Sequence, residues 1–219
     1  MASLLILGAG KFGLLALKRL SAQDSETRFV MVDCRAAALG RARSLGVPGV
    51  DLIEAEAIDY LAAHVGAEPP WKWLIPMVPV HVAYAWLLKG PLAGQGWGPA
   101  EVPGDLKELA ALAIRGTEGG LYLSHAGHVC PDDCAEPEVC PVTGEERAQP
   151  LFQKLAGASR PERPVFVVAS RQLAPGVGGY SPHKLTELAE AVRRTSGPLL
   201  VATACRCHGV VHGLQRQGE

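Results

Sequence analysis

The chain has 219 residues, of which 48% are hydrophobic and 20% are charged, and its formal net charge is −1. This length allows one large domain or two small ones with a full hydrophobic core. The balanced charge argues against nucleic acid or an anionic membrane as a partner, because both attract strongly basic surfaces.

The apolar segments and the cysteines bear on location. Met1 leads directly into a strand pattern, so no secretory signal is expected. The longest apolar stretch, residues 71–88, carries Lys72, His81 and two prolines and fails as a membrane span. Six cysteines in such a chain are expected to be reduced. The sequence therefore predicts a cytoplasmic protein with no membrane partner, whose thiols serve metal or redox chemistry.

The amino-terminal segment carries a dinucleotide-binding pattern. An apolar run over residues 4–7 is followed by Gly8-Ala9-Gly10-Lys11-Phe12-Gly13, by a helical pattern over residues 14–20 and by a second apolar run that ends at Asp33. This is G-x-G-x-x-G between a strand and a helix, with an acidic residue at the end of the next strand. A glycine turn that merely connects a strand to a helix is the alternative.

Each position of this pattern has a physical role. Gly8 makes the tight turn, Gly10 lets a pyrophosphate approach the backbone, and Gly13 lets the helix pack close to the strand. The phosphates would meet the free N–H groups of the helix start, and Asp33 would bind ribose hydroxyls. Asp33 would also repel a 2′-phosphate, which favours NAD(H) over NADP(H), although Arg35 offers that phosphate a positive partner. The expected cofactor-binding residues are Gly8, Gly10, Lys11, Phe12, Gly13 and Asp33.

The rest of the chain continues the alternation of strands and helices. Helices are expected at residues 36–45, 57–65, 80–88, 106–114, 151–156 and 182–195, and strands at 51–54, 73–76, 121–124, 165–169 and 199–204, before a short polar tail from Val210. This order predicts an α/β fold with a doubly wound, mainly parallel, Rossmann-like sheet of about seven strands.

We expect residues 1–219 to form a single Rossmann-like domain. Residues 1–89 would be its dinucleotide-binding half, and residues 90–219 a second half that carries a cysteine-rich loop excursion over 125–164. Polar and glycine-rich segments follow several predicted strands, and parallel strands gather their carboxyl ends at one rim. His81 and Arg171 are the candidate catalytic groups, although a histidine such as His81 is more often a helix cap. Residues 171–179 form a second glycine-rich loop.

Three cysteines in this loop have the spacing C-x3-C-x5-C, at Cys130, Cys134 and Cys140. Thiolates select zinc or an iron–sulfur cluster, and a tetrahedral site needs a fourth ligand. We expect a shared site, in which the fourth ligand is Cys205, Cys207 or His208 from the other end of the chain. In the alternative, a local site, the fourth ligand would be His125 or His128. Thiols in a loop held by its prolines are the alternative without metal. The candidate metal ligands are Cys130, Cys134, Cys140, Cys205, Cys207 and His208.

Residues 4 to 61 resemble the nucleotide-binding domain of the potassium-uptake regulators of the RCK/KTN group. The glycine loop at residues 8–13 looks like the loop of that group, and Val32-Asp33-Cys34-Arg35 with Ala42-Arg43-Ser44-Leu45-Gly46 is similar to its second strand and helix. The resemblance implies NAD-type ligands at Gly8, Gly10, Gly13 and Asp33.

The sequence thus predicts an NAD(P)-dependent oxidoreductase, or a protein derived from one, with a metal centre near the nucleotide. The alternatives are a non-enzymatic, nucleotide-sensing regulatory module that signals to a partner, and a structural domain stapled by zinc. A small-molecule nucleotide is the expected partner, and homo-oligomer formation is left open.

Overall fold

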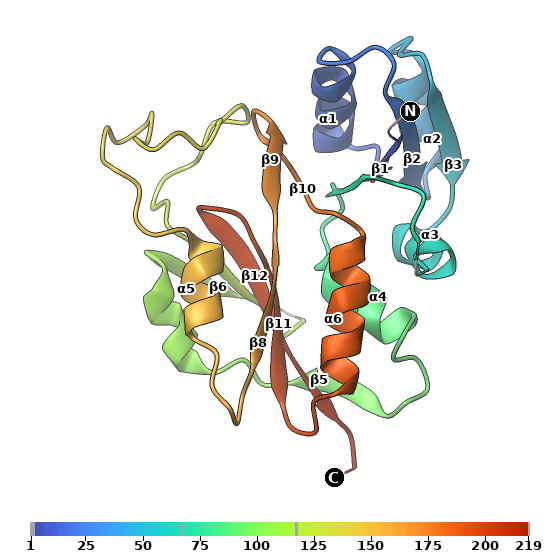
Figure 1. Ribbon diagram of the computed structural model, residues 1–219. Coiled ribbons are helices and arrows are strands. Elements are labelled where there is room, and N and C mark those ends of the chain that lie inside the picture. Colours follow the sequence, from blue (N-terminus) through green and yellow to red (C-terminus); the bar gives the residue numbers. More distant parts are fainter. Residues whose placement is uncertain (1–2, 67, 117, 219) are drawn as a thin grey trace.

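A computed structural model describes residues 3–66, 68–116 and 118–218. The first part of the chain alternates strands and helices: β1 (Ser3–Leu7), α1 (Lys11–Ser21), β2 (Arg28–Asp33), α2 (Ala36–Arg43), β3 (Val50–Glu54), α3 (Ala57–His64), β4 (Trp73–Pro76) and α4 (Val82–Lys89). Its four strands form one parallel sheet in the order β3-β2-β1-β4 (Figure 1). The order reverses between β1 and β4, because β2 follows β1 on one side and β4 returns on the other.

Helices cover both faces of this sheet because its central strand is apolar on both sides. Leu5 and Leu7 of β1 pack in one buried cluster with α3 and α4. Leu4 and Ile6, which alternate with them, pack in another with α1 and α2. A strand buried on both faces in this way is typical of a parallel sheet.

The second part forms different sheets. Its elements are β5 (Trp97–Ala100), the 3₁₀-helix η1 (Gly104–Leu109), β6 (Leu112–Arg115), β7 (Leu121–Ser124), α5 (Leu151–Gly157), β8 (Val165–Ala169), β9 (Arg171–Ala174), β10 (Val177–Gly179), α6 (His183–Arg193), β11 (Leu199–Ala204) and β12 (His208–Arg216). The larger sheet has the order β6-β7-β12-β11-β8, with β5 also paired to β12. Here β11 runs parallel to β8, whereas β12 runs antiparallel to β11, β7 and β5. The strands β9 and β10 form a separate antiparallel hairpin.

The expected α/β class is confirmed, and the first four strands are parallel as expected. The prediction of a single, mainly parallel sheet is wrong, because the described strands form three sheets. The helix expected over 106–114 is a 3₁₀-helix followed by β6, the glycine-rich loop over 171–179 is the β9–β10 hairpin, and the expected polar tail is β12. Glycines conceal this last strand in the sequence. A Cβ atom at Gly213 would lie 2.3 Å from the carbonyl oxygen of Ala100 on the neighbouring strand, so close pairing requires glycine there.

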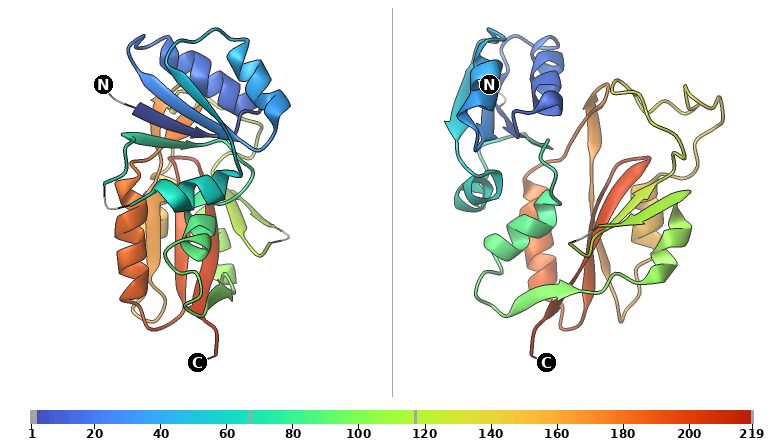
Figure 2. Two further views of the ribbon diagram at one scale, coloured as in Figure 1. Left: turned by 90° about the vertical axis from the view of Figure 1, so that its right-hand side faces the viewer. Right: turned by 180° about the vertical axis from the view of Figure 1, so that it is seen from behind.

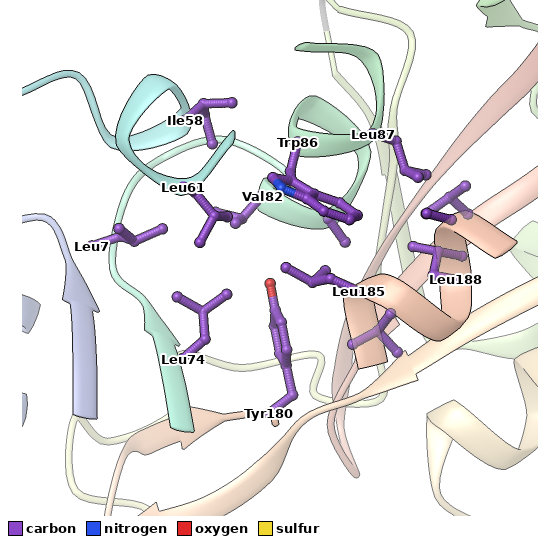
Figure 3. Packing of buried hydrophobic residues seen from close by; sticks show 14 of the residues in the cluster. Leu7, Ile58, Leu61, Leu74, Val82, Trp86, Leu87, Tyr180, Leu185 and Leu188 are labelled. Atoms are coloured by element: carbon purple, nitrogen blue, oxygen red, sulfur yellow. The ribbon is translucent and has the colours of Figure 1, made fainter. Parts of the chain in front are cut away.

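One apolar cluster joins the two parts. Figure 3 shows Tyr180 between Leu74 of the parallel sheet and Leu185 of α6, with Trp86 of α4 beside them. Tyr180 is 1% exposed, and its backbone pairs with that of Leu74 through N···O distances of 2.8 and 3.0 Å. The residues expected as two halves therefore share a continuous core.

The segment between β7 and α5, residues 125–150, is called the cysteine loop below. It extends upward beside the β9–β10 hairpin, which stands between this loop and the parallel sheet (Figures 1 and 2). None of the helices in the described part of the chain combines the length and the apolar character that a membrane span requires.

Candidate functional site

The turn from β1 to α1 explains two of its three glycines by packing. Gly8 has φ of +99°, and a Cβ atom there would lie 2.6 Å from the carbonyl oxygen of Met77. A Cβ at Gly13 would lie 1.9 Å from the carbonyl oxygen of Gly8. At Gly10 the nearest atom would be 3.9 Å away, on the side chain of Arg35. The packing of the protein therefore requires Gly8 and Gly13 but leaves Gly10 facing free space.

A cavity of about 430 Å³, called the turn cavity, opens at this point. It lies where the strand order reverses between β1 and β4, the usual place for ligands of open α/β sheets. Gly10 is the N-cap of α1 and has no side chain to cap the first N–H groups of the helix. The residues that line it are Gly8, Gly10, Lys11, Phe12, Asp33, Arg35 and Pro76 to Pro79.

Asp33 is buried at the wall of this cavity, and its carboxylate is held on both oxygens. It accepts hydrogen bonds from the backbone N–H of Ala9 (2.8 Å) and of Arg35 (2.9 Å), and from Nε of Arg35 (3.0 Å). Burial opposes ionisation, but the hydrogen bonds from Arg35 and Ala9 outweigh it and lower the pKa of Asp33 to about 2. The expected ribose partner is therefore ionised at neutral pH and already paired with Arg35.

The second site gathers thiols that are far apart in the sequence. Cys130 and Cys134 of the cysteine loop line one cavity of about 430 Å³ together with Cys205 and Cys207 from the turn between β11 and β12 and with His208 at the start of β12. We call it the thiol cavity. Cys140 and His128 line a further cavity, which shares Cys207 and Arg147 with the thiol cavity. The structure thus brings the expected ligands of the cysteine loop close to those at residues 205–208. Cys34, in contrast, is exposed at the end of β2.

Short distances link these sulfurs to two imidazoles. Cys130 Sγ lies 3.7 Å from Nε2 of His208 and 4.0 Å from Nε2 of His128, and Cys140 Sγ lies 3.8 Å from the same atom of His128. His125, the other local candidate, contacts the Gln149 carbonyl oxygen at 3.1 Å. In the described part of the chain, no three His, Cys, Asp or Glu side chains are already arranged to hold a metal ion.

Arg147 stands between two of the thiols. Its Nη1 donates to Cys207 Sγ at 2.7 Å, its Nη2 to Cys134 Sγ at 3.3 Å, and its Nε to the carbonyl oxygen of Pro137 at 2.6 Å. Burial opposes the charge on Arg147, but Cys207 and Cys134 outweigh this and raise its pKa. The guanidinium therefore stays charged and fixes the positions of these two sulfurs.

The other cysteines differ in their electrostatics. Backbone N–H groups of Thr143 and Val142 lower the pKa of Cys140, since they stabilise its thiolate. Burial raises the pKa of Cys205 to about 12, and Glu136 adds to this effect. Cys140 is thus much better prepared than Cys205 to act as a thiolate.

The first turn of α1 connects the two cavities. Phe12 lines both of them. Lys11 Nζ lies 2.5 Å from a carboxylate oxygen of Asp132, between Cys130 and Cys134 in the chain. Arg19, further along α1, donates to the Asp132 carbonyl oxygen at 2.8 Å. The helix that begins at the glycine turn therefore holds the cysteine loop directly.

The two candidate catalytic groups have different surroundings. Arg171 lines the thiol cavity. His81 is buried and is not among the residues that line either cavity, and its Nδ1 lies 2.9 Å from Nδ1 of His212 and its Nε2 3.0 Å from Oγ1 of Thr203. Burial, aided by His212, lowers the pKa of His81 to about 3. His81 therefore links the start of α4 to β11 and β12 of the second sheet.

Two residues of these sites are not predicted from the sequence. Arg147 lies in the cysteine loop without a motif around it, and Gln172 of β9 donates to the Cys134 carbonyl oxygen at 2.6 Å. The only signal for Arg147 was a positive charge close to three thiols in the sequence.

Comparisons with known proteins show a family for the second part of the chain. Residues 80–217 match the family model AF_1314_C, described as "Uncharacterized protein, C-terminal domain". This segment includes the second sheet and the cysteine loop. A relative from Archaeoglobus fulgidus, described as "Uncharacterized protein", is 30% identical over 223 residues, which cover 96% of this chain and 98% of the relative. No solved structure matches. The chain belongs to the AF_1314_C family.

Proposed function

We propose that this chain is an NAD(P)-binding redox protein in which a dinucleotide at the β1–α1 turn adjoins a metal centre ligated by cysteine and histidine. The observation that carries this proposal is the position of Phe12, which lines both the turn cavity and the thiol cavity. A ligand over the glycine turn and a group among the thiols would share this wall, so chemistry at one is within reach of the other.

The nucleotide half of the proposal rests on the geometry of the turn. The strand order β3-β2-β1-β4 is that of the first four strands of a Rossmann sheet. The uncapped start of α1 offers N–H groups and a positive dipole end to phosphates, and Gly10 leaves them space. Lys11 adds a positive charge at the same place.

The cofactor preference depends on Arg35. Ionised Asp33 opposes a 2′-phosphate, which supports the expected preference for NAD(H). The guanidinium of Arg35 pairs with this carboxylate and is largely exposed, with a side chain that is 63% accessible. Because it offers a positive partner to a 2′-phosphate, we expect the preference for NAD(H) over NADP(H) to be small.

The metal half rests on the donor set. Thiolates and imidazoles together suit zinc, and thiolates suit iron–sulfur clusters. Zinc would fix the loop or polarise a substrate oxygen, and a cluster would exchange electrons. The chain itself contributes the positions of the sulfurs, the positive charge of Arg147 and the positive charge of Arg171 at the cavity wall.

The nucleotide half is tested by Gly10→Val and titration calorimetry. A Cβ atom at Gly10 would meet nothing nearer than a side-chain nitrogen of Arg35 at 3.9 Å, so we expect the fold to persist while the pyrophosphate is excluded. Gly40→Val is the matched control, because a Cβ at this α2 position meets nothing within 4 Å and lies away from the turn cavity. Loss of binding in the first variant alone supports the proposal. Wild-type protein that binds neither NAD(H) nor NADP(H) at millimolar concentration would refute it.

The metal half is tested by analysis of protein purified without oxygen. Zinc, or iron with inorganic sulfide, should be present in stoichiometric amounts, and a cluster would add visible absorption. A wild-type protein that holds neither metal and takes up none would contradict this half of the proposal.

The second candidate function is a nucleotide sensor that does not turn the cofactor over. It is favoured by the contacts between α1 and the cysteine loop. Lys11 and Arg19 both bind Asp132, so a nucleotide at the turn would alter the loop without any reaction. Substrate-dependent oxidation or reduction of the bound cofactor supports the enzyme. Reversible binding that changes the loop without turnover supports the sensor.

A further inference from the structure

Within the proposed metal centre, on which this inference rests, we infer that a single divalent ion is held by His128, Cys130, Cys140 and His208. Cys134 and Cys207 stay outside its coordination sphere, as a thiol pair bound to Arg147. The site would therefore be of the Cys2His2 class that zinc prefers.

The distances between donors support this set. Zinc lies at about 2.3 Å from sulfur and 2.0–2.1 Å from nitrogen, which puts S and N about 3.6 Å apart in a tetrahedral site. The sulfur of Cys130 lies 3.7 Å from Nε2 of His208 and 4.0 Å from Nε2 of His128, and Cys140 Sγ lies 3.8 Å from the latter. Three of the six edges of the tetrahedron thus lie within about 0.4 Å of the required length. We expect side-chain rotations on metal binding to place the four donors around one ion.

Arg147 excludes the other two sulfurs from this ion. One N–H of its guanidinium points to Cys207 and another to Cys134, and Nε is held by Pro137. A cation placed between these two thiols would have to displace a fixed positive charge. The two negative charges of two thiolates balance the charge of a divalent ion, and two neutral imidazoles add none, so these four ligands need no further cation. Arg147 supplies the positive charge beside the other pair, Cys134 and Cys207.

The turn between β11 and β12 orients His208. The backbone N–H of Cys205 donates to the His208 carbonyl oxygen at 2.9 Å, and the His208 N–H donates to Cys205 Sγ at 3.4 Å. Nδ1 of His208 faces the same sulfur at 4.0 Å, which leaves Nε2 directed at Cys130. Contacts of this kind behind a ligand commonly fix which imidazole nitrogen meets the metal. Cys205 therefore acts as a positioning residue for His208.

The inference is tested by zinc and cobalt binding to the full-length protein prepared without oxygen. His128→Asn and Cys140→Ser should each lower zinc affinity at least about tenfold, whereas Cys134→Ser and Cys207→Ser should keep the wild-type stoichiometry and affinity. The two pairs of variants are matched, because each contains a serine substitution in the same loop. In wild-type protein, X-ray absorption at the zinc edge should count two sulfur and two nitrogen ligands, a measurement that needs no variant to fold.

Failure of this inference can be told apart from failure of the metal centre itself. Loss of zinc in Cys134→Ser or Cys207→Ser, or a count of three or four sulfurs, would overturn the ligand set and keep a metal centre. Iron with inorganic sulfide in place of zinc would do the same. A wild-type protein that binds no zinc, cobalt or iron would overturn both.

Discussion

The glycine turn takes the backbone groups that would face phosphates from one continuous segment, residues 8–13, whereas the thiols come from residues 130–140 and 205–208. Backbone N–H groups and glycines form the first site, so the strand and helix around it fix its shape. Side chains on a long loop form the second, so its shape depends on Arg147, the α1 contacts and the proposed metal. The first site should therefore be nearly complete without ligand, and the second should not.

Removal of the metal should produce the largest difference in amide exchange between the cysteine loop and the glycine-turn region. With a chelator, amide exchange in residues 125–150 should accelerate by about tenfold or more, because the ligands no longer tie the loop to β12. Residues 3–33 should keep their protection. Hydrogen exchange with mass spectrometry measures both regions in one sample. Equal acceleration in both would show that the loop is not held independently.

Gly13→Ala should destabilise the glycine-turn region and not the cysteine loop. A Cβ there would lie 1.9 Å from the carbonyl oxygen of Gly8, a backbone atom that cannot move aside. We expect a loss of about 3 kcal/mol in the free energy of unfolding, measured with urea. Gly10→Ala is the control and should change it by less than about 1 kcal/mol, because its nearest neighbour is 3.9 Å away. Similar losses in both variants would contradict the assignment of the two glycines.

Acid should weaken the contact between α4 and the second sheet. Burial, with a contribution from His212, lowers the pKa of His81 to about 3, below the value near 6.5 of the unfolded chain. The unfolded state therefore binds more protons below pH 6.5, and stability is complete above this pH and falls as the pH decreases toward 3. The loss from His81 alone should reach about 2 kcal/mol at pH 5.

Unfolding at several pH values checks this slope. His81→Gln keeps a side chain that can hydrogen-bond to His212 and Thr203 but removes one titrating group. Its stability should depend less steeply on pH between 6.5 and 5. Identical slopes for the variant and the wild type would show that His81 is not the group responsible.

Arg35→Ala should sharpen the cofactor preference of the turn. The variant exposes the charge of Asp33 and removes the positive partner of a 2′-phosphate. Affinity for NADP(H) should fall about tenfold relative to that for NAD(H), as measured by calorimetry. An unchanged ratio of the two affinities would show that neither residue lies beside the 2′ position.

The two regions also differ in what their sequences reveal. The glycine spacing and the apolar runs of the parallel sheet are local patterns, so the sequence predicted these strands and their helices. The thiols were predicted to meet because each set follows a strand. The second sheet was missed because β12 contains Gly209, His212 and Gly213, which do not resemble a central strand. Arg147 and the His81–His212 contact depend on residues far apart in the chain, which periodicity does not report.

The smallest expected effect concerns the contact between the two regions. Lys11 and Asp132 form an exposed ion pair, with side chains 70% and 47% accessible, so Asp132→Asn should change the free energy of unfolding by less than about 1 kcal/mol. The same variant should bind NAD(H) about two- to fivefold more tightly at low salt, because Lys11 becomes free to meet the phosphates. Asp133→Asn is the control, since this neighbouring carboxylate is exposed in the same loop. An equal gain in both variants would indicate a general effect of charge, and a gain confined to Asp132→Asn would show that the nucleotide and the cysteine loop compete for Lys11.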